Sequence, residues 1–248
     1  MVSNLFSSVY PYSYAEAMRK NELPIWRDSF HVNVACKEAV EQAISEGHDG
    51  KTLSEDCARQ VLDVYGFKRL GYVLANTLRE KSTDGRFSPQ NKEWGRTIFV
   101  PPDSQHNYQF MVDSHPAVLD GFINQYRKEY QKLNLFEVKH CVEDPRAQDF
   151  TGKVIVMHPD TLHEDFWESR YQLWYAHDGF GCSPTASGRS IRCTCLADGE
   201  TTRWNRAEFI GPIQEQYLPD WAKEQSEKLR NGQEISTPEN EERQVMSV

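Results

Sequence analysis

The chain has 248 residues, of which 12% are aromatic, and its mean hydropathy is −0.71. This aromatic content excludes a chain that is disordered throughout, and the low hydropathy predicts a strongly polar exterior. No apolar run reaches the roughly 18 residues needed to cross a bilayer, and residues 1–14 lack the basic and apolar regions of an export signal. We therefore expect a cytoplasmic protein with no membrane partner.

The net charge of −9 is distributed unevenly along the chain. Residues 1–140 hold 17 basic and 18 acidic side chains, whereas residues 141–248 hold 11 basic and 19 acidic ones. This difference predicts a second module with its own electrostatic character. A negative net charge repels phosphate at long range, so it disfavours broad binding of nucleic acid, although a local basic patch can still bind it.

The first part of the chain begins with patterns typical of helices. Apolar residues spaced three to four apart predict a helix over 24–46, and Gly47 provides its end. Thr52 and Glu55 have the spacing of a capping box, so a second helix is expected from there to Gly66.

Helical and extended patterns then alternate. A third apolar stripe predicts a helix over 70–80, and a serine followed by proline predicts the start of a short helix over 88–94. Short β-branched and aromatic runs at 97–100 and 108–112 predict two strands. Ser114 is expected to cap the last helix of this part.

The order of the patterns changes after a polar stretch at 144–152. A strand is expected over 153–157, followed by a helix that begins at Thr161, with Glu164 completing a capping box. One face of this helix would carry an aromatic cluster composed of Phe166, Trp167, Tyr171 and Trp174.

The remaining patterns predict a hairpin and a final helix. A strand begins at Ser190, and the dipeptide at 198–199 is a turn signal before a strand over 201–204. Asn205 is expected to cap a short helical turn, and a last helix is expected over 219–230.

Together these elements predict an α+β fold. Residues 1–146 would form a mostly helical domain with a small sheet, and residues 147–230 a smaller mixed α/β module that contains the hairpin. Residues 231–248 are acidic and lack an apolar stripe, so they cannot bury enough surface to offset their ordering entropy. We expect this tail to be disordered.

The six cysteines are expected to be reduced thiols without a metal. Cys193 and Cys195 alternate with polar residues, as on a half-buried strand, and share their inward face with Ile191. Buried thiols behave as small hydrophobes, and a C-x-C pair without a C-x-x-C partner is a weak zinc signal.

No motif of a known catalytic site is present. The sequence lacks an H-E-x-x-H helix, a phosphate-binding G-x-x-x-x-G-K-[ST] loop and a G-x-S-x-G elbow. His158 and His163 lie five residues apart, which does not place them on one helix face. We therefore predict no catalytic residue, no metal ligand and no cofactor.

Two clusters combine arginine with tryptophan and are the candidate partner-binding sites. They comprise Arg86, Trp94 and Arg96 in the first, and Arg203, Trp204 and Arg206 in the second. Arginine and tryptophan dominate interface hot spots and also stack on nucleic-acid bases. The alternative is a small core with arginine stems lying along it.

Several stretches resemble an uncharacterised domain family carried by integrative conjugative elements of gut bacteria. The resemblance covers about residues 9–132 and is carried by the stretches 35–41, 72–79, 84–94 and 114–116. A block at 172–182, with 198–200 and 203–206, looks like a module that accompanies such proteins. The resemblance implies a mobile-element setting and no established chemistry.

Three functional hypotheses follow from this setting and the acidic charge. The first is a non-enzymatic protein that binds and inhibits a basic host defence nuclease, such as a CRISPR effector or a restriction enzyme. The second is a nucleic-acid-binding accessory of conjugative transfer that uses the arginine and tryptophan clusters on single strands. The third is an enzyme with an unrecognised site.

Overall fold

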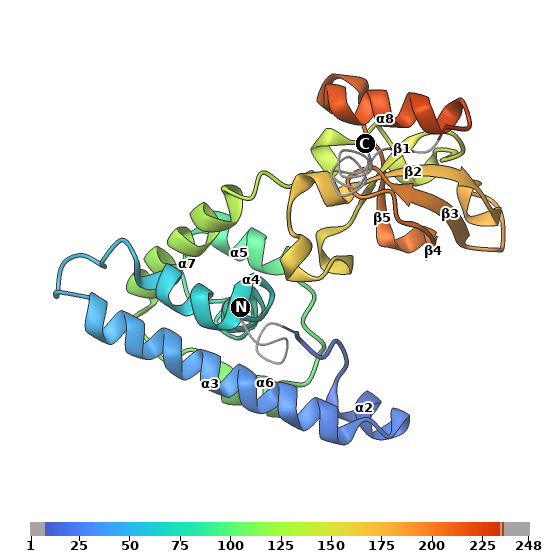
Figure 1. The fold of residues 1–248 in the computed structure, drawn as a ribbon. Coiled ribbons are helices and arrows are strands. Elements are labelled where there is room, and N and C mark those ends of the chain that lie inside the picture. The colour runs from blue at the N-terminus through green and yellow to red at the C-terminus, as the bar shows by residue number, and fades with distance from the viewer. Residues whose placement is uncertain (1–7, 234, 236–248) are drawn as a thin grey trace, which may run out of the picture. The chain divides into compact units, whose positions relative to one another are not determined.

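The computed structural model describes residues 8–233 and residue 235, and Figure 1 shows its elements. The chain divides into two compact units, Met1–Lys132 and Leu133–Val248, here called the helical unit and the sheet unit. The expected domain boundary was at residue 146, but the sheet unit already begins at Leu133, so residues 133–146 belong to the sheet unit. Gln172 exchanges hydrogen bonds with both backbone groups of Phe136, and Cys141 forms a β-bridge with Ile213.

Six α-helices and one 3-10 turn make up the described part of the helical unit. They are α2 (Tyr14–Lys20), α3 (Leu23–Gly47), α4 (Cys57–Glu80), α5 (Pro89–Thr97), α6 (Ser104–Asn107), η1 (Tyr108–Phe110) and α7 (Pro116–Gln131). α4 is the central helix and packs against α3, α5 and α7. Residues 69–78 of α4 are all buried, as expected for a helix with neighbours on every side.

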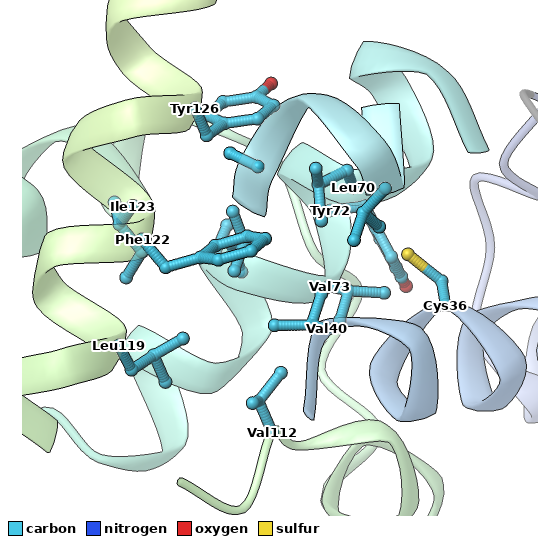
Figure 2. Close-up of a cluster of buried hydrophobic side chains, with 14 of the residues drawn as sticks. Cys36, Val40, Leu70, Tyr72, Val73, Val112, Leu119, Phe122, Ile123 and Tyr126 are labelled. Carbon is cyan, nitrogen blue, oxygen red and sulfur yellow. The ribbon is translucent and has the colours of Figure 1, made fainter. Parts of the chain in front are cut away.

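Figure 2 shows the main core of the helical unit. Val40 of α3, Val73 of α4 and Phe122 of α7 meet in one cluster of buried side chains. Gly66 interrupts α4 with a φ of 73°, a conformation that favours glycine, so the two expected helices meet at this residue. Gly71 of α4 lies so close to the Tyr126 hydroxyl that a Cβ there would collide with it.

The two strands expected in this unit were wrong. Residues 97–100 include the end of α5, residues 108–110 form a 3-10 turn, and the described residues of the unit contain no strand. Val100, Phe110 and Val112 are nevertheless buried. These residues are apolar because they pack against the core from loops and a 3-10 turn, and not because they form a sheet.

The predicted helix caps in this unit had mixed outcomes. Ser88 caps α5 as expected, because its side chain accepts a hydrogen bond from the Asn91 N–H. The capping box at Thr52 was wrong: Asp49 accepts hydrogen bonds from the Thr52 backbone and hydroxyl, and α4 begins later at Cys57. The cap of α7 is also displaced by one residue, from Ser114 to His115.

The sheet unit contains one five-stranded antiparallel sheet in the order β4-β3-β2-β1-β5. The strands are β1 (Val154–Met157), β2 (Leu173–Asp178), β3 (Ser190–Cys195), β4 (Thr201–Asn205) and β5 (Phe209–Pro212). The helices are η2 (Val138–His140), η3 (Pro145–Ala147), η4 (Pro159–Thr161), η5 (Glu164–Phe166), η6 (Ser169–Gln172), η7 (Phe180–Cys182), η8 (Arg206–Glu208), η9 (Glu215–Tyr217) and α8 (Asp220–Arg230). The α+β fold with a helical first part is confirmed.

The hairpin and its flanking elements are confirmed. Gly199 has a φ of 79° in the turn between β3 and β4, and the Asn205 side chain accepts a hydrogen bond from the Ala207 N–H at the start of η8. The strand expected at 153–157 and the last helix are also present, as β1 and α8.

The helix expected from Thr161 was wrong. Three 3-10 turns, η4 to η6, occupy this segment, and Trp174 lies in β2. The imidazoles of His158 and His163 accept hydrogen bonds from the backbone N–H two residues further on, which favours single turns. The Trp167 indole N–H donates to the carbonyl of Pro159 and thereby holds the turns together.

All six cysteines are buried, free thiols. Ile191, Cys193 and Cys195 are buried on β3, as the alternation predicted. Burial raises the pKa of both thiols to about 12, so they are protonated at neutral pH. The absence of a bound metal stays a prediction.

None of the helices in the described residues has the length and apolar composition that a membrane span requires. The predicted acidic tail, 231–248, falls mostly on residues 234 and 236–248, which lie outside the described part of the chain.

Candidate binding surfaces

Arg86 lies in the turn between α4 and α5 and is held by a neighbouring carboxylate. Its Nε and Nη2 donate to the Asp84 carboxylate at 2.9 and 2.7 Å. Hydrogen bonds from Arg86 hold the pKa of Asp84 well below its usual range, so this carboxylate stays ionised. Arg86 is exposed, but much of its charge is neutralised locally.

Trp94 is a half-buried side chain that packs against the core of the helical unit. Its ring lies 5.3 Å from the Tyr126 ring, measured between centroids, with the planes tilted. This arrangement fits the core alternative, in which the tryptophan anchors α5 and the nearby arginines remain at the surface.

Arg96 lines a pocket that the sequence analysis did not anticipate. The pocket has a volume of about 320 Å³ and lies between the end of α4 and α5. Its lining comprises Leu78, Arg79, Ser82, Lys92, Gly95 and Arg96, and we call it the cationic pocket. The spacing of Lys92 and Arg96, four residues apart, could have indicated that both lie on one face of α5.

The two helices approach closely where the cationic pocket forms. A Cβ on Gly95 would lie 2.9 Å from Leu78 Cδ1, so only glycine allows α5 to pack at this distance without a shift. Arg79 Nη2 donates to the carbonyls of Arg96, at 3.4 Å, and of Ile98. These bonds satisfy carbonyls at the end of α5 and hold the Arg79 guanidinium at the pocket.

In the second cluster, Arg206 does not lie at the surface, as a partner-binding residue would. Arg206 is only 4% exposed, and its guanidinium lies 3.7 Å from the centroid of the Phe150 ring. It donates to four backbone carbonyls, those of Arg146, Gln148, Gly181 and Cys182, at 2.7–2.9 Å. Arg206 therefore links its own turn to the segments 146–148 and 181–182 of the sheet unit and is not available to a partner.

Trp204 and Arg203 lie on β4, an outer strand of the sheet. Trp204 is half-buried opposite Ile191 and meets Trp174 edge to face, with ring centroids 6.1 Å apart. Arg203 is exposed opposite Arg192, which forms an ion pair with Asp178 at 2.6 Å. Of the second cluster, Arg203 is thus the arginine that reaches the surface.

The sheet unit also presents an acidic surface. Asp220, Glu224 and Glu227 are exposed on α8, spaced four and three residues apart, and we call them the acidic face of α8. The Asp220 residue is exposed while Ala222 is fully buried, so α8 has distinct outer and inner faces. The spacing places the three carboxylates along one side of the helix.

A match to a known protein family is found for the helical unit. Residues 9–131 match a family described as a protein of unknown function, DUF3849. The matched residues all lie in the helical unit. The resemblance to an uncharacterised family over residues 9–132 is thereby confirmed, and the link to conjugative elements stays a prediction. No curated protein and no solved structure matches the chain.

Proposed function

We propose that the chain is a non-enzymatic accessory protein of a mobile genetic element that binds and inhibits a host defence nuclease, of the CRISPR-effector or restriction type. The charge of the sheet unit carries this proposal: 12 basic and 20 acidic side chains, against 16 and 17 in the helical unit. Nucleases hold DNA through basic side chains at the phosphates. An acidic surface competes for those side chains.

The acidic face of α8 supports the proposal through its geometry. A helix rises about 1.5 Å per residue, so the backbones of Asp220 and Glu224 are about 6 Å apart along the axis, and Glu227 follows after about 4.5 Å. One DNA strand presents a phosphate about every 3.4 Å of axis. The face therefore offers three carboxylates in a row on a helix, spaced more widely than the phosphates of a strand, and Asp220 is paired with Lys223 at 3.5 Å.

The inhibitory surface can be tested by removing its charge without changing its shape. The triple variant Asp220→Asn, Glu224→Gln, Glu227→Gln alters three exposed carboxylates of α8. The matched control, Asp28→Asn, Glu55→Gln, Asp63→Asn, removes three exposed carboxylates from the helical unit. Both variants change the net charge equally, so a difference between them reports position and not total charge.

The measurement is DNA cleavage by purified host CRISPR effectors and restriction enzymes at increasing concentrations of the full chain. We expect inhibition of at least one nuclease, with the α8 variant requiring an at least about tenfold higher concentration, a shift typical of losing interface charge pairs. The control variant should match the parent chain. Equal loss in both variants would show that the acidic face is not the site.

The test also separates the alternatives. Binding of single-stranded DNA with a steep salt dependence, in the absence of nuclease inhibition, would favour the transfer accessory. Absence of both activities would contradict the proposed function.

A further inference from the structure

We propose that the cationic pocket of the helical unit is a binding site for a phosphate group, of the kind carried by a nucleotide or by the 5′ end of a nucleic acid. The inference rests on three cationic side chains from two helices, Arg79, Lys92 and Arg96, that line one hollow together with a hydroxyl. It is independent of the proposed function, because it concerns a different unit and the opposite charge.

The three cations of the pocket have few partners of their own. Within the described residues, Arg79, Lys92 and Arg96 take part in no ion pair. The Asp84 carboxylate interacts with Lys92 electrostatically, but it accepts its side-chain hydrogen bonds from Arg86. Like charges lining one small hollow repel each other, and a bound dianion would relieve that repulsion.

The pocket is organised before any ligand binds. Arg79 is fixed by its bonds to the carbonyls of Arg96 and Ile98, which leaves its Nε and Nη1 without a hydrogen-bond partner among the described residues. The close contact between Gly95 and Leu78 sets the distance between the cations of α4 and those of α5. Groups held in advance lose little conformational entropy when they bind.

The set of donors favours phosphate over other anions. Two guanidinium groups supply planar forks that match phosphate oxygens, Lys92 supplies a compact charge, and Ser82 supplies a hydroxyl. A phosphate monoester presents three strong acceptor oxygens, whereas a carboxylate presents two in one plane. The volume of about 320 Å³ leaves room for the group that carries the phosphate, with Leu78 as an apolar wall.

The experiment is calorimetric titration of the full chain with inorganic phosphate, at constant ionic strength maintained with chloride. We expect saturable binding that weakens at least about tenfold in Lys92→Gln and in Arg96→Gln, as for the loss of one charge-assisted hydrogen bond. The control is Arg59→Gln, which removes an exposed cation of α4 outside the pocket and should leave binding unchanged. Lys92→Arg should restore most of the affinity, because it keeps the charge.

Further titrations identify the source of the phosphate. AMP should bind and adenosine should not, and an oligonucleotide should bind better with a 5′-phosphate than without one. Tighter binding of AMP indicates a mononucleotide site, and tighter binding of the phosphorylated oligonucleotide indicates a strand end. Absence of saturable phosphate binding, or equal affinity in the parent chain and the folded Lys92→Gln and Arg96→Gln variants, would overturn the proposal.

Discussion

The two units use arginine beside tryptophan in opposite ways. In the helical unit Trp94 packs inward and Arg96 stays at the surface, where it lines the cationic pocket. In the sheet unit Arg206 is buried and joins loops through four carbonyls. The same pair of residue types therefore lines a pocket at the surface of one unit and forms an internal support in the other.

The difference follows from what surrounds each guanidinium. Backbone carbonyls at loops need donors when they are buried, and a single arginine with five N–H groups can satisfy several of them. Arg69 of the helical unit serves in a similar way, since it is fully buried and donates to Ser29 and Asn33. Buried arginine is thus a structural device in both units, and exposure distinguishes the candidate binding residues.

The largest expected effect is the loss of Arg206. Arg206→Ala removes a buried cation and its hydrogen bonds to four backbone carbonyls, of which those to Gly181 and Cys182 are buried, so we expect the free energy of unfolding to fall by about 3–5 kcal/mol. The neighbouring Arg203→Ala should change it by less than about 0.5 kcal/mol, because Arg203 is exposed. Urea denaturation of both variants measures the difference. Equal stability of the two would refute the structural role of Arg206.

A smaller effect is expected for Trp94. Trp94→Ala removes a half-buried ring from the contact with Tyr126, and we expect a loss of about 2 kcal/mol. Arg96→Gln should leave the stability within about 0.5 kcal/mol, because its side chain lies at the surface. Thermal unfolding of the two variants tests whether Trp94 anchors the helix while Arg96 only lines the pocket. A large destabilisation by Arg96→Gln would show that Arg96 also has a structural role.

The smallest effect concerns the exposed pair of Asp84 and Arg86. The pKa of Asp84 is lowered in the folded chain, chiefly by hydrogen bonds from Arg86, so the carboxylate stabilises the fold above its unfolded pKa of about 3.9. That contribution is lost as the pH falls through the lowered folded pKa. We expect the parent chain to melt slightly higher than Asp84→Asn at pH 7, with a difference that shrinks as the pH falls below about 4. A difference in melting temperature that stays constant from about pH 4 down to about pH 2 would contradict this linkage.

The local elements of the chain were determined by nearby residues in the sequence. Ser88 caps α5 and Asn205 caps η8 because a short polar side chain reaches a backbone N–H two or three residues away. The turn at Gly199 likewise needs only a residue that accepts a positive φ. These three features are set within a few residues, so the sequence predicts them, whereas the helix starts expected at Thr52 and Thr161 did not form.

The tertiary structure decided which apolar and charged residues are buried. The runs that contain Val100 and Phe110 have the apolar pattern of strands. They pack against helices instead, and the described residues of the helical unit contain no strand. The pocket brings Arg79 together with Arg96, which is 17 residues away, and Arg206 meets carbonyls 24 to 60 residues away. Burial and long-range hydrogen bonding depend on which segments meet in space, and a local pattern does not contain that information.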